Sequence, residues 1–201
     1  MMIPKLDFKY SYTYDELFRT SGELNKILKS NGKKYPSPME IVEFMNELEI
    51  VWRNEGNKIL EEISRLSGIK WKTRNISCYI VGSCRPMSDP LTIKVCNDIT
   101  HAVDVLTHEL IHCLQIGISD RKWTKWQRYL DSKYPRENKI TKDHVFLNAV
   151  HMALYLDFFG ADRLIRDMWN SNVSSEYKRS WQIVEKEGPD KIVSKFKQIT
   201  R

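Results

Sequence analysis

The chain lacks the sequence patterns that mark several large classes of protein. It has only four cysteines in 201 residues, unevenly spaced and without a CxxC pair, which argues against a zinc ribbon and against a dense disulfide framework. No apolar run is long enough to cross a membrane, and the longest one, 149–160, is interrupted by His151 and Asp157. Internal repeats and low-complexity segments are also lacking. We therefore expect a globular protein with no membrane partner.

The N-terminus carries no recognisable targeting segment. Residues 1–7 contain no apolar h-region, so we expect no signal peptide. Together with the few cysteines, this predicts an intracellular, cytoplasmic protein in which each cysteine is reduced and packs as a small hydrophobe. The composition, 41% hydrophobic and 29% charged, is typical of a soluble globular protein. The length fits a single domain, 1–201.

Hydrophobic periodicity and capping residues predict a mostly helical chain with two strands. Helices are expected over 14–30, from a capping box at Ser37 to Gly68 with a break or bend near 54–56, over 98–117, 120–133 and 141–159, and near 161–169, 175–187 and 189–199. Strands are expected over 76–81 and 91–95. The predicted fold class is α+β, predominantly helical, with a small antiparallel or mixed sheet beside the helix at 98–117. The domain then has a helical N-terminal part, 1–68, a core, 69–160, and a helical C-terminal part, 161–201.

Histidine is scarce, with five in the chain, yet two of them lie in the sequence HELIH at 108–112. Asp98 is a suitable N-cap for a helix through this motif. Residues i and i+4 share a helix face, so His108 and His112 can both approach one metal ion, about 2.0–2.1 Å from each ring nitrogen. Glu109 beside them can take the proton of a metal-bound water. The spacing is that of the HExxH zinc hydrolases.

A third metal ligand is expected, because catalytic zinc sites usually have three protein ligands. The helix at 141–159 is apolar nearly all round, and polar side chains on a buried helix need partners. Its polar face carries His144, Asn148, His151 and Tyr155. We favour His151 over His144 as the third ligand, because His151 is central in the apolar run. A carboxylate or one of Cys78, Cys84 and Cys96 is an open alternative.

These features resemble the zincin superfamily of metallopeptidases. The resemblance covers roughly residues 76–160, and the chain is most similar to compact HExxH proteins of bacteria and phages. It implies one Zn²⁺ ion held by His108 and His112, Glu109 as general base, and the strand at 91–95 as an edge that aligns a peptide substrate. The chain departs from better-known branches. It lacks the HExxHxxGxxH continuation, a downstream Asn-Glu pair, and the Gly-Cys-Leu stretch of peptide deformylases.

The expected activity is zinc-dependent hydrolysis, with a peptide or protein as substrate. Zinc lowers the pKa of its bound water toward about 7 and polarises the scissile carbonyl. Glu109 accepts the proton of the water and passes it to the leaving amine. The oxyanion needs a second donor, for which we predict Tyr155, with His144 as the alternative. Asp104, one turn before the motif, can accept a hydrogen bond from an imidazole N–H.

Two other functions are compatible with the sequence. One is a non-catalytic zincin-like binding protein, with a structural metal or none. The other is a nucleic-acid-associated module using the segment 119–142, where eight Lys or Arg stand against three Asp or Glu and are interleaved with aromatic residues. We favour a packing role for this segment, because Trp123, Trp126 and Leu130 share one helical face. The net charge of +6 does not by itself indicate nucleic-acid binding.

Overall fold

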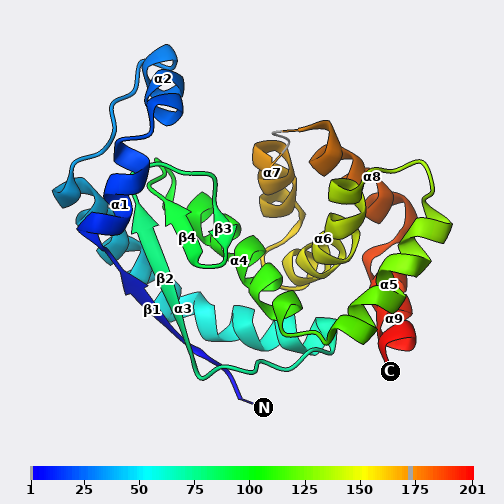
Figure 1. Ribbon diagram of the computed structural model, residues 1–201. Coiled ribbons are helices and arrows are strands. Elements are labelled where there is room, and N and C mark those ends of the chain that lie inside the picture. The colour runs from blue at the N-terminus through cyan, green and yellow to red at the C-terminus, as the bar shows by residue number, and fades with distance from the viewer. Residues whose placement is uncertain (1, 172–173) are drawn as a thin grey trace. The chain divides into compact units, whose positions relative to one another are not determined.

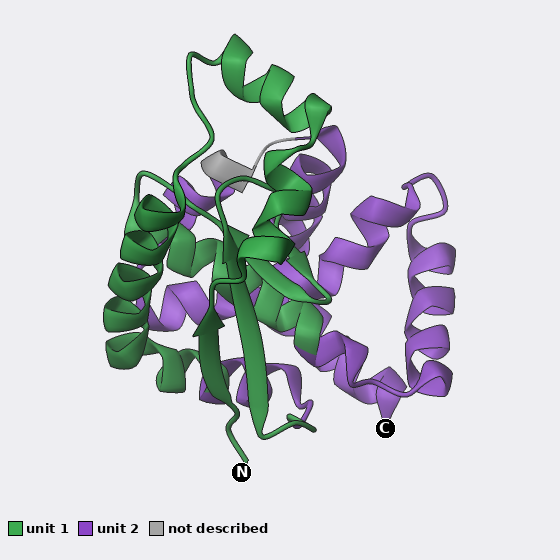
Figure 2. Cartoon of the chain, turned by 60° about the vertical axis from the view of Figure 1, so that its left-hand side comes forward, with its two compact units in different colours: residues 1–60, 71–113 green, residues 61–70, 114–201 purple. Residues whose placement is uncertain are grey.

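The computed structural model describes residues 2–171 and 174–201 of the chain (Figure 1). These residues form nine helices and a four-stranded sheet, so the fold is α+β and mostly helical, as predicted. The chain divides into two compact units (Figure 2): unit 1 comprises 1–60 and 71–113, and unit 2 comprises 61–70 and 114–201. The assignment of the whole chain to one domain stays a prediction. Within the described residues, no helix combines the length and apolar character needed to cross a membrane.

The described part of unit 1 contains a mixed sheet in the order β1-β2-β4-β3. Its strands are β1 (Lys5–Lys9), β2 (Asn75–Val81), β3 (Met87–Ser88) and β4 (Leu91–Lys94). β1 and β4 pair with β2 in parallel, whereas β3 pairs with β4 antiparallel. The predicted strands at 76–81 and 91–95 correspond to β2 and β4. Since β3 pairs with Leu91 and Thr92, the first half of β4 is not the open edge that the zincin resemblance implies.

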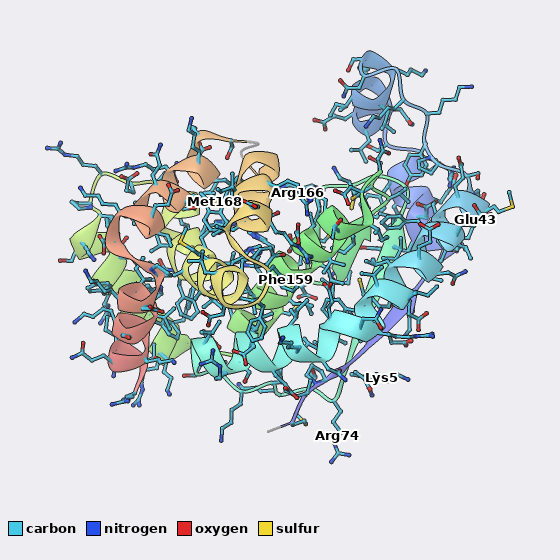
Figure 3. All side chains as sticks on the ribbon, turned by 180° about the vertical axis from the view of Figure 1, so that it is seen from behind. Lys5, Glu43, Arg74, Phe159, Arg166 and Met168 are labelled. Carbon is cyan, nitrogen blue, oxygen red and sulfur yellow. The ribbon has the colours of Figure 1, made fainter. Side chains whose placement is uncertain are left out.

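Strand β1 is absent from the predicted elements. Its residues alternate, with Leu6 and Phe8 toward the core and charged residues outward, which is the period-2 pattern of a half-buried strand. Lys5 N donates to the Arg74 carbonyl at 2.9 Å, next to the first pair of the β1–β2 ladder, and both side chains extend outward there (Figure 3). This alternation covers only five residues, and the strand is defined by its pairing with a segment far along the chain.

The N-terminal helices of the chain are α1 (Tyr12–Arg19), α2 (Gly22–Ser30) and α3 (Pro38–Ser67). The single helix predicted over 14–30 is instead two helices, because the Ser21 hydroxyl accepts a hydrogen bond from Leu24 N and caps a new helix. α3 begins with the predicted capping box. The side chains of Ser37 and Glu40 each accept a hydrogen bond from the other residue's backbone N–H.

α3 runs over 30 residues, and the break predicted near 54–56 does not occur. Gly56 serves packing at this position, because a Cβ added there would lie 2.3 Å from the indole of Trp52, one turn earlier. That indole in turn lies edge-on to Phe8 of β1, with ring centroids 6.4 Å apart. A glycine in a helix interior lowers stability by about 1 kcal/mol relative to alanine. At this position it leaves room for the Trp52 ring, which packs α3 on the sheet.

Helices α1 and α3 cover opposite faces of the sheet. Trp52 of α3 packs on Phe8, whereas Tyr14 of α1 packs on Tyr79 of β2 with ring centroids 5.1 Å apart. Phe8 pairs in register with Cys78. Because consecutive residues of a strand point to opposite faces, Phe8 and Tyr79 mark the two sides. Helices therefore pack on both faces of the sheet, although Lys5, Asp7 and Lys9 of β1 remain exposed on the Tyr79 face.

Asp15 of α1 is completely buried and is the polar centre of this region. Its Oδ2 accepts a hydrogen bond from Arg19 Nη2 at 2.7 Å, and its Oδ1 accepts from the Tyr35 hydroxyl at 2.7 Å and from Gly82 N at 2.8 Å. These bonds join α1 to the segment before α3 and to the turn after β2. A side chain at Gly82 would not fit, because an added Cβ would lie 2.2 Å from the Tyr35 ring.

We predict that Asp15→Ala lowers the free energy of unfolding by about 2–3 kcal/mol. The variant leaves the Gly82 N–H and the Tyr35 hydroxyl without their acceptor. It also removes the closer of the two carboxylates paired with Arg19, which is partly exposed and hence screened. Urea unfolding followed by circular dichroism measures the change. The control, Asp7→Ala, breaks only an exposed ion pair and should cost less than about 0.5 kcal/mol. Equal losses in the two variants would contradict this role of Asp15.

Unit 2 is helical throughout its described elements. They are α5 (Asp120–Lys133), α6 (Lys139–Phe158), α7 (Ala161–Ser171), α8 (Ser175–Glu187) and α9 (Pro189–Thr200), with the last residues of α4 (Ile99–Ile116) and the end of α3. All of these helices were expected from periodicity within a few residues. α6 begins two residues earlier than predicted, because Asn138 is its N-cap and accepts a hydrogen bond from Thr141 N at 2.8 Å.

α6 is the central helix of unit 2 and contacts α5, α7, α8 and α9. Every residue from His144 to Tyr155 is buried. Phe146 stacks on Phe196 of α9 with ring centroids 3.7 Å apart, and Trp126 of α5 lies edge-on to both rings. This aromatic cluster joins three helices into one core. The apolar side chains predicted nearly all round α6 are therefore the surface on which the neighbouring helices pack.

Candidate metal centre

α4 (Ile99–Ile116) carries the HExxH motif and begins where predicted. Asp98 caps it: the Oδ1 atom accepts hydrogen bonds from Thr100 N at 2.9 Å and from His101 N at 3.4 Å. Apolar side chains at helical spacing, among them Val103, Leu106 and Leu110, are fully buried. The helix is held by this apolar face, and the histidines of the motif project from the opposite side.

His108 and His112 lie one turn apart, and their imidazoles are neighbours. The ring centroids are 5.1 Å apart with an angle of 71° between the planes, and one ring nitrogen of each residue lies within 4.8 Å of the other. Two nitrogens that bind one tetrahedral zinc ion, each about 2.0–2.1 Å from it, are themselves roughly 3.4 Å apart. Both residues are half-buried. The spacing of the pair is therefore compatible with two ligands of one ion.

Glu109 is buried, with 8% of its surface exposed. Burial raises the pKa of its carboxyl to about 7, and the positive charge of Arg85 opposes this shift. A general base is most effective when its pKa is near the working pH. Arg85 comes from the connection between β2 and β3. No local pattern in the sequence singles it out, because only the fold brings it near Glu109.

The four cysteines are free thiols, as expected from their number and spacing. Cys78 and Cys84 are buried and Cys96 is partly buried, and burial raises the pKa of each thiol above its usual value. Among the described residues of unit 1, no three His, Cys, Asp or Glu side chains place one ligand atom each within 4.8 Å of one another. Within unit 1, none of these cysteines therefore forms a three-ligand cluster with His108 and His112.

His151 of α6 is 1% exposed and is surrounded by side chains of unit 2. Its ring lies 4.4 Å from the ring of Tyr155 and 5.8 Å from that of Trp181, measured between centroids, and its Nε2 is 3.6 Å from Oδ2 of Asp167. Burial lowers the pKa of the imidazole to about 3, with a contribution from the charge of Arg163. The ring is therefore neutral at pH 7. Its role as third ligand stays a prediction.

His144, near the start of α6, has a different environment within unit 2. Its Nδ1 lies 2.7 Å from the Ile140 carbonyl oxygen, and its ring is edge-on to Tyr177 of α8 at a centroid distance of 4.5 Å. A hydrogen bond to a carbonyl requires the proton on Nδ1, which leaves the lone pair on Nε2. This is the tautomer usual for metal-binding histidines, whose second nitrogen is held by a carbonyl or carboxylate.

The chain was also compared with protein-family models, with curated proteins and with solved structures. None of them matches. The resemblance to zincins, and with it the metal, the activity and the substrate, stays a prediction from the motif and its surroundings.

Three other residues of the predicted site, Tyr155, Asn148 and Asp104, are buried and have identifiable contacts within their own units. Tyr155 is completely buried among aromatic side chains of unit 2, and its role as oxyanion donor stays a prediction. Asn148 Nδ2 donates to Ser180 Oγ at 2.6 Å, so this buried amide has a partner within the helical core. Asp104 is buried on α4, with a carboxylate oxygen within 4.8 Å of a ring nitrogen of His101.

The basic aromatic segment 119–142 forms α5 and the start of α6. Trp126 and Leu130 are buried, with at most 1% of their surface exposed, which confirms the predicted packing face at these two positions. Trp123 is only half-buried, so it does not fully share that face. The buried indole of Trp126 is not available to stack on the bases of a nucleic-acid strand, and nucleic-acid binding by the segment stays a prediction.

Proposed function

We propose that the chain is a zinc-dependent hydrolase that cleaves peptide bonds. The observation that carries the proposal is the arrangement on α4, where neighbouring imidazoles of His108 and His112 flank the buried Glu109. Burying a carboxylate costs free energy, and the pKa of about 7 suits a general base. Support for a peptide as the substrate comes from the resemblance to zincins.

We propose His144 as the third ligand, in place of the His151 favoured by the sequence. The Nδ1 atom of His144 is held by the Ile140 carbonyl at 2.7 Å, which orients the ring with Nε2 as the ligand atom. His151 instead lies between aromatic rings, with its Nε2 directed toward Asp167. Both environments lie within unit 2. They favour His144 as a ligand and His151 as a residue of the helical core.

Glu109 is the residue that moves protons in this proposal. When bound, zinc supplies a Lewis acid for the scissile carbonyl and lowers the pKa of a water molecule to about 7. Glu109 accepts the proton of the attacking water and returns it to the leaving amine. β4 continues past its pairing with β3 at Ile93 and Lys94, and a substrate strand would add there through backbone hydrogen bonds.

The proposal is tested by metal content and hydrolysis together. Protein purified without chelator should contain about one zinc per chain by plasma mass spectrometry, and it should cleave an unfolded protein such as casein. Removal of the metal with 1,10-phenanthroline should abolish cleavage, and addition of zinc should restore it. Absence of zinc from protein dialysed against a small excess of the metal would refute the proposal.

We predict that His112→Ala abolishes stoichiometric zinc binding, because only one imidazole of the motif is left. Loss of a direct ligand should weaken binding by more than the roughly 10–100-fold typical of outer-shell changes. Calorimetric titration with zinc measures the affinity. The matched control is His101→Ala on the same helix, which should keep its zinc. Circular dichroism shows whether both variants are folded, and equal zinc affinity in the two folded variants would count against the motif as the binding site.

A further inference from the structure

The segment 82–88, which follows β2 and ends with β3, is held at its start by two residues from earlier in the chain. The Gly82 N–H donates to Oδ1 of the buried Asp15 at 2.8 Å, and the Tyr35 hydroxyl donates to the same oxygen at 2.7 Å. The Tyr35 ring also packs directly on Gly82, since an added Cβ there would lie 2.2 Å from it. Because hydrogen bonds to a carboxylate are strong, Asp15 and Tyr35 fix the point where the segment leaves the sheet.

The other end of the segment is attached to α4 one turn beyond Glu109. The Cys113 thiol donates to the Ser88 carbonyl oxygen, with Sγ 3.3 Å from it. Met87 and Ser88 also pair with β4. Glu109 and Cys113 are residues i and i+4 of one helix, so they share the face that carries this contact. The segment therefore runs from a fixed point at the sheet to a fixed point beside Glu109.

The residues between these two points lie close to Glu109. Cys84 is 4% exposed, and burial raises the pKa of its thiol to about 12, with an opposing effect from Lys94 and a further increase from the charge of Glu109. The charge of the next residue, Arg85, acts in turn on the Glu109 carboxyl. Coulomb interactions weaken with distance, so both residues are neighbours of this carboxyl. The segment thus borders the buried Glu109 from within the same unit.

We propose that Asp15 and Tyr35 are positioning residues of the proposed hydrolase centre, acting through the segment 82–88. They hold the segment against α4, which keeps bulk water from the Glu109 carboxylate and keeps the base aligned with the attacking water. Neither residue touches the reacting atoms. The inference rests on the proposed function, because Glu109 needs this alignment only if it acts as a base.

Thiol alkylation of the full-length folded chain tests the position of the segment without relying on hydrolysis. Tyr35→Phe keeps the ring beside Gly82 and removes only the hydrogen bond to Asp15. Labelling of Cys84 by iodoacetamide, measured by mass spectrometry of its peptide, should become at least about tenfold faster, because a buried thiol reacts through local opening. Labelling of Cys78, which is completely buried in β2, reports global unfolding and should keep its wild-type rate.

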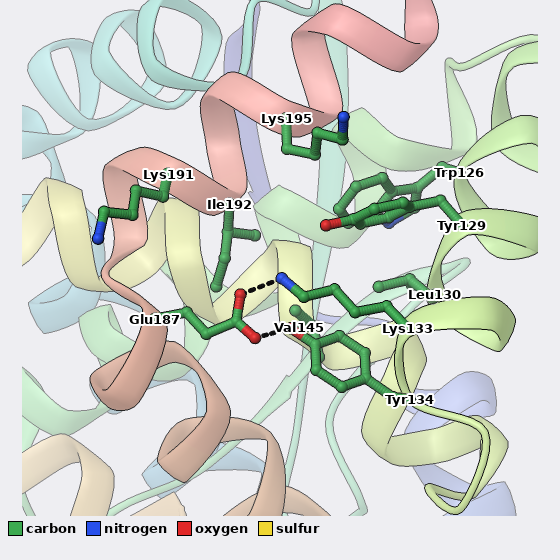
Figure 4. A pocket seen from close by; sticks show the side chains of 10 residues that line it. All are labelled: Trp126, Tyr129, Leu130, Lys133, Tyr134, Val145, Glu187, Lys191, Ile192 and Lys195. Atoms are coloured by element: carbon green, nitrogen blue, oxygen red, sulfur yellow. Dashed lines mark hydrogen bonds and ion pairs between the residues drawn. The ribbon is translucent and has the colours of Figure 1, made fainter.

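The matched control is Tyr134→Phe in unit 2. The Tyr134 hydroxyl also donates to a carboxylate, Oε1 of Glu187 at 2.6 Å (Figure 4), so this variant loses the same kind of bond outside the segment. It should leave the labelling of both cysteines unchanged. Gly82→Ala disturbs the segment from its other partner, because the added methyl group has no room beside the Tyr35 ring. It should raise the labelling of Cys84 as Tyr35→Phe does.

Hydrolysis of casein then shows whether the position of the segment matters for catalysis. Tyr35→Phe should lower kcat by about 10–100-fold with KM and zinc content near wild type, because a misaligned base slows the chemical step rather than substrate binding. Tyr134→Phe should retain full activity. The inference is overturned if Tyr35→Phe leaves Cys84 labelling or kcat unchanged, or if Cys78 labelling rises equally. A wild-type chain without hydrolysis would instead refute the proposed function itself.

Discussion

Glu109→Gln should lower the rate of peptide hydrolysis by about 10²–10⁴-fold, the usual contribution of a general acid–base residue. This corresponds to about 3–5 kcal/mol of transition-state stabilisation. The amide has nearly the shape of the carboxylate but cannot accept a proton, so the loss should appear in kcat more than in KM. Zinc content should stay at the wild-type value, because Glu109 is not a ligand in the proposed centre.

The variant is suitable because it removes a charge from a buried position. Glu109 is 8% exposed, and burial raises the pKa of its carboxyl to about 7; a neutral amide is easier to bury at alkaline pH. Glu109→Gln should therefore not lower stability, and a fall in rate cannot be ascribed to unfolding. The matched control is Glu43→Gln at the exposed surface of α3 (Figure 3). Full activity of Glu109→Gln with zinc bound would exclude Glu109 as the base.

The elements that sequence predicts correctly in this chain are those specified by neighbouring residues. α4 could be placed because its N-cap, Asp98, and its apolar stripe lie within the helix or next to it. The capping box of α3 is local in the same way, and Ser37 and Glu40 make the expected pair of hydrogen bonds. The adjacency of His108 and His112 also follows from helical geometry alone.

The features that sequence does not predict depend on contacts between distant segments. Strand β1 exists through its pairing with β2, and the proximity of Arg85 to Glu109 arises from a turn between strands. At Gly56 the sequence predicts a break that does not occur, because the glycine instead makes room for the ring of Trp52. In each case the deciding partner lies on another turn or another element, and periodicity within one segment does not identify that partner.

Burial bears on the choice of third ligand, which stays a prediction. His151 is central in the most apolar part of α6, and a polar residue there needs a partner. Asp167, Tyr155 and Trp181 already surround its ring within unit 2. A residue near the end of the apolar run, His144, has instead the carbonyl contact that fixes a ligand tautomer. The environments within unit 2 are the reason why we propose His144 rather than His151 as the ligand.

His144→Ala should therefore weaken zinc binding by at least about 100-fold, more than the loss of an outer-shell partner, whereas His151→Gln should leave the affinity within about threefold of wild type. The second variant should instead lower the free energy of unfolding, since it disturbs a fully buried ring with contacts on two other helices. Zinc titration and urea unfolding on both variants give a crossed pattern: one loses metal affinity and the other stability. If His151→Gln loses zinc while His144→Ala retains it, the ligand assignment must be reversed, and the His108–His112 pair would still be tested separately by His112→Ala.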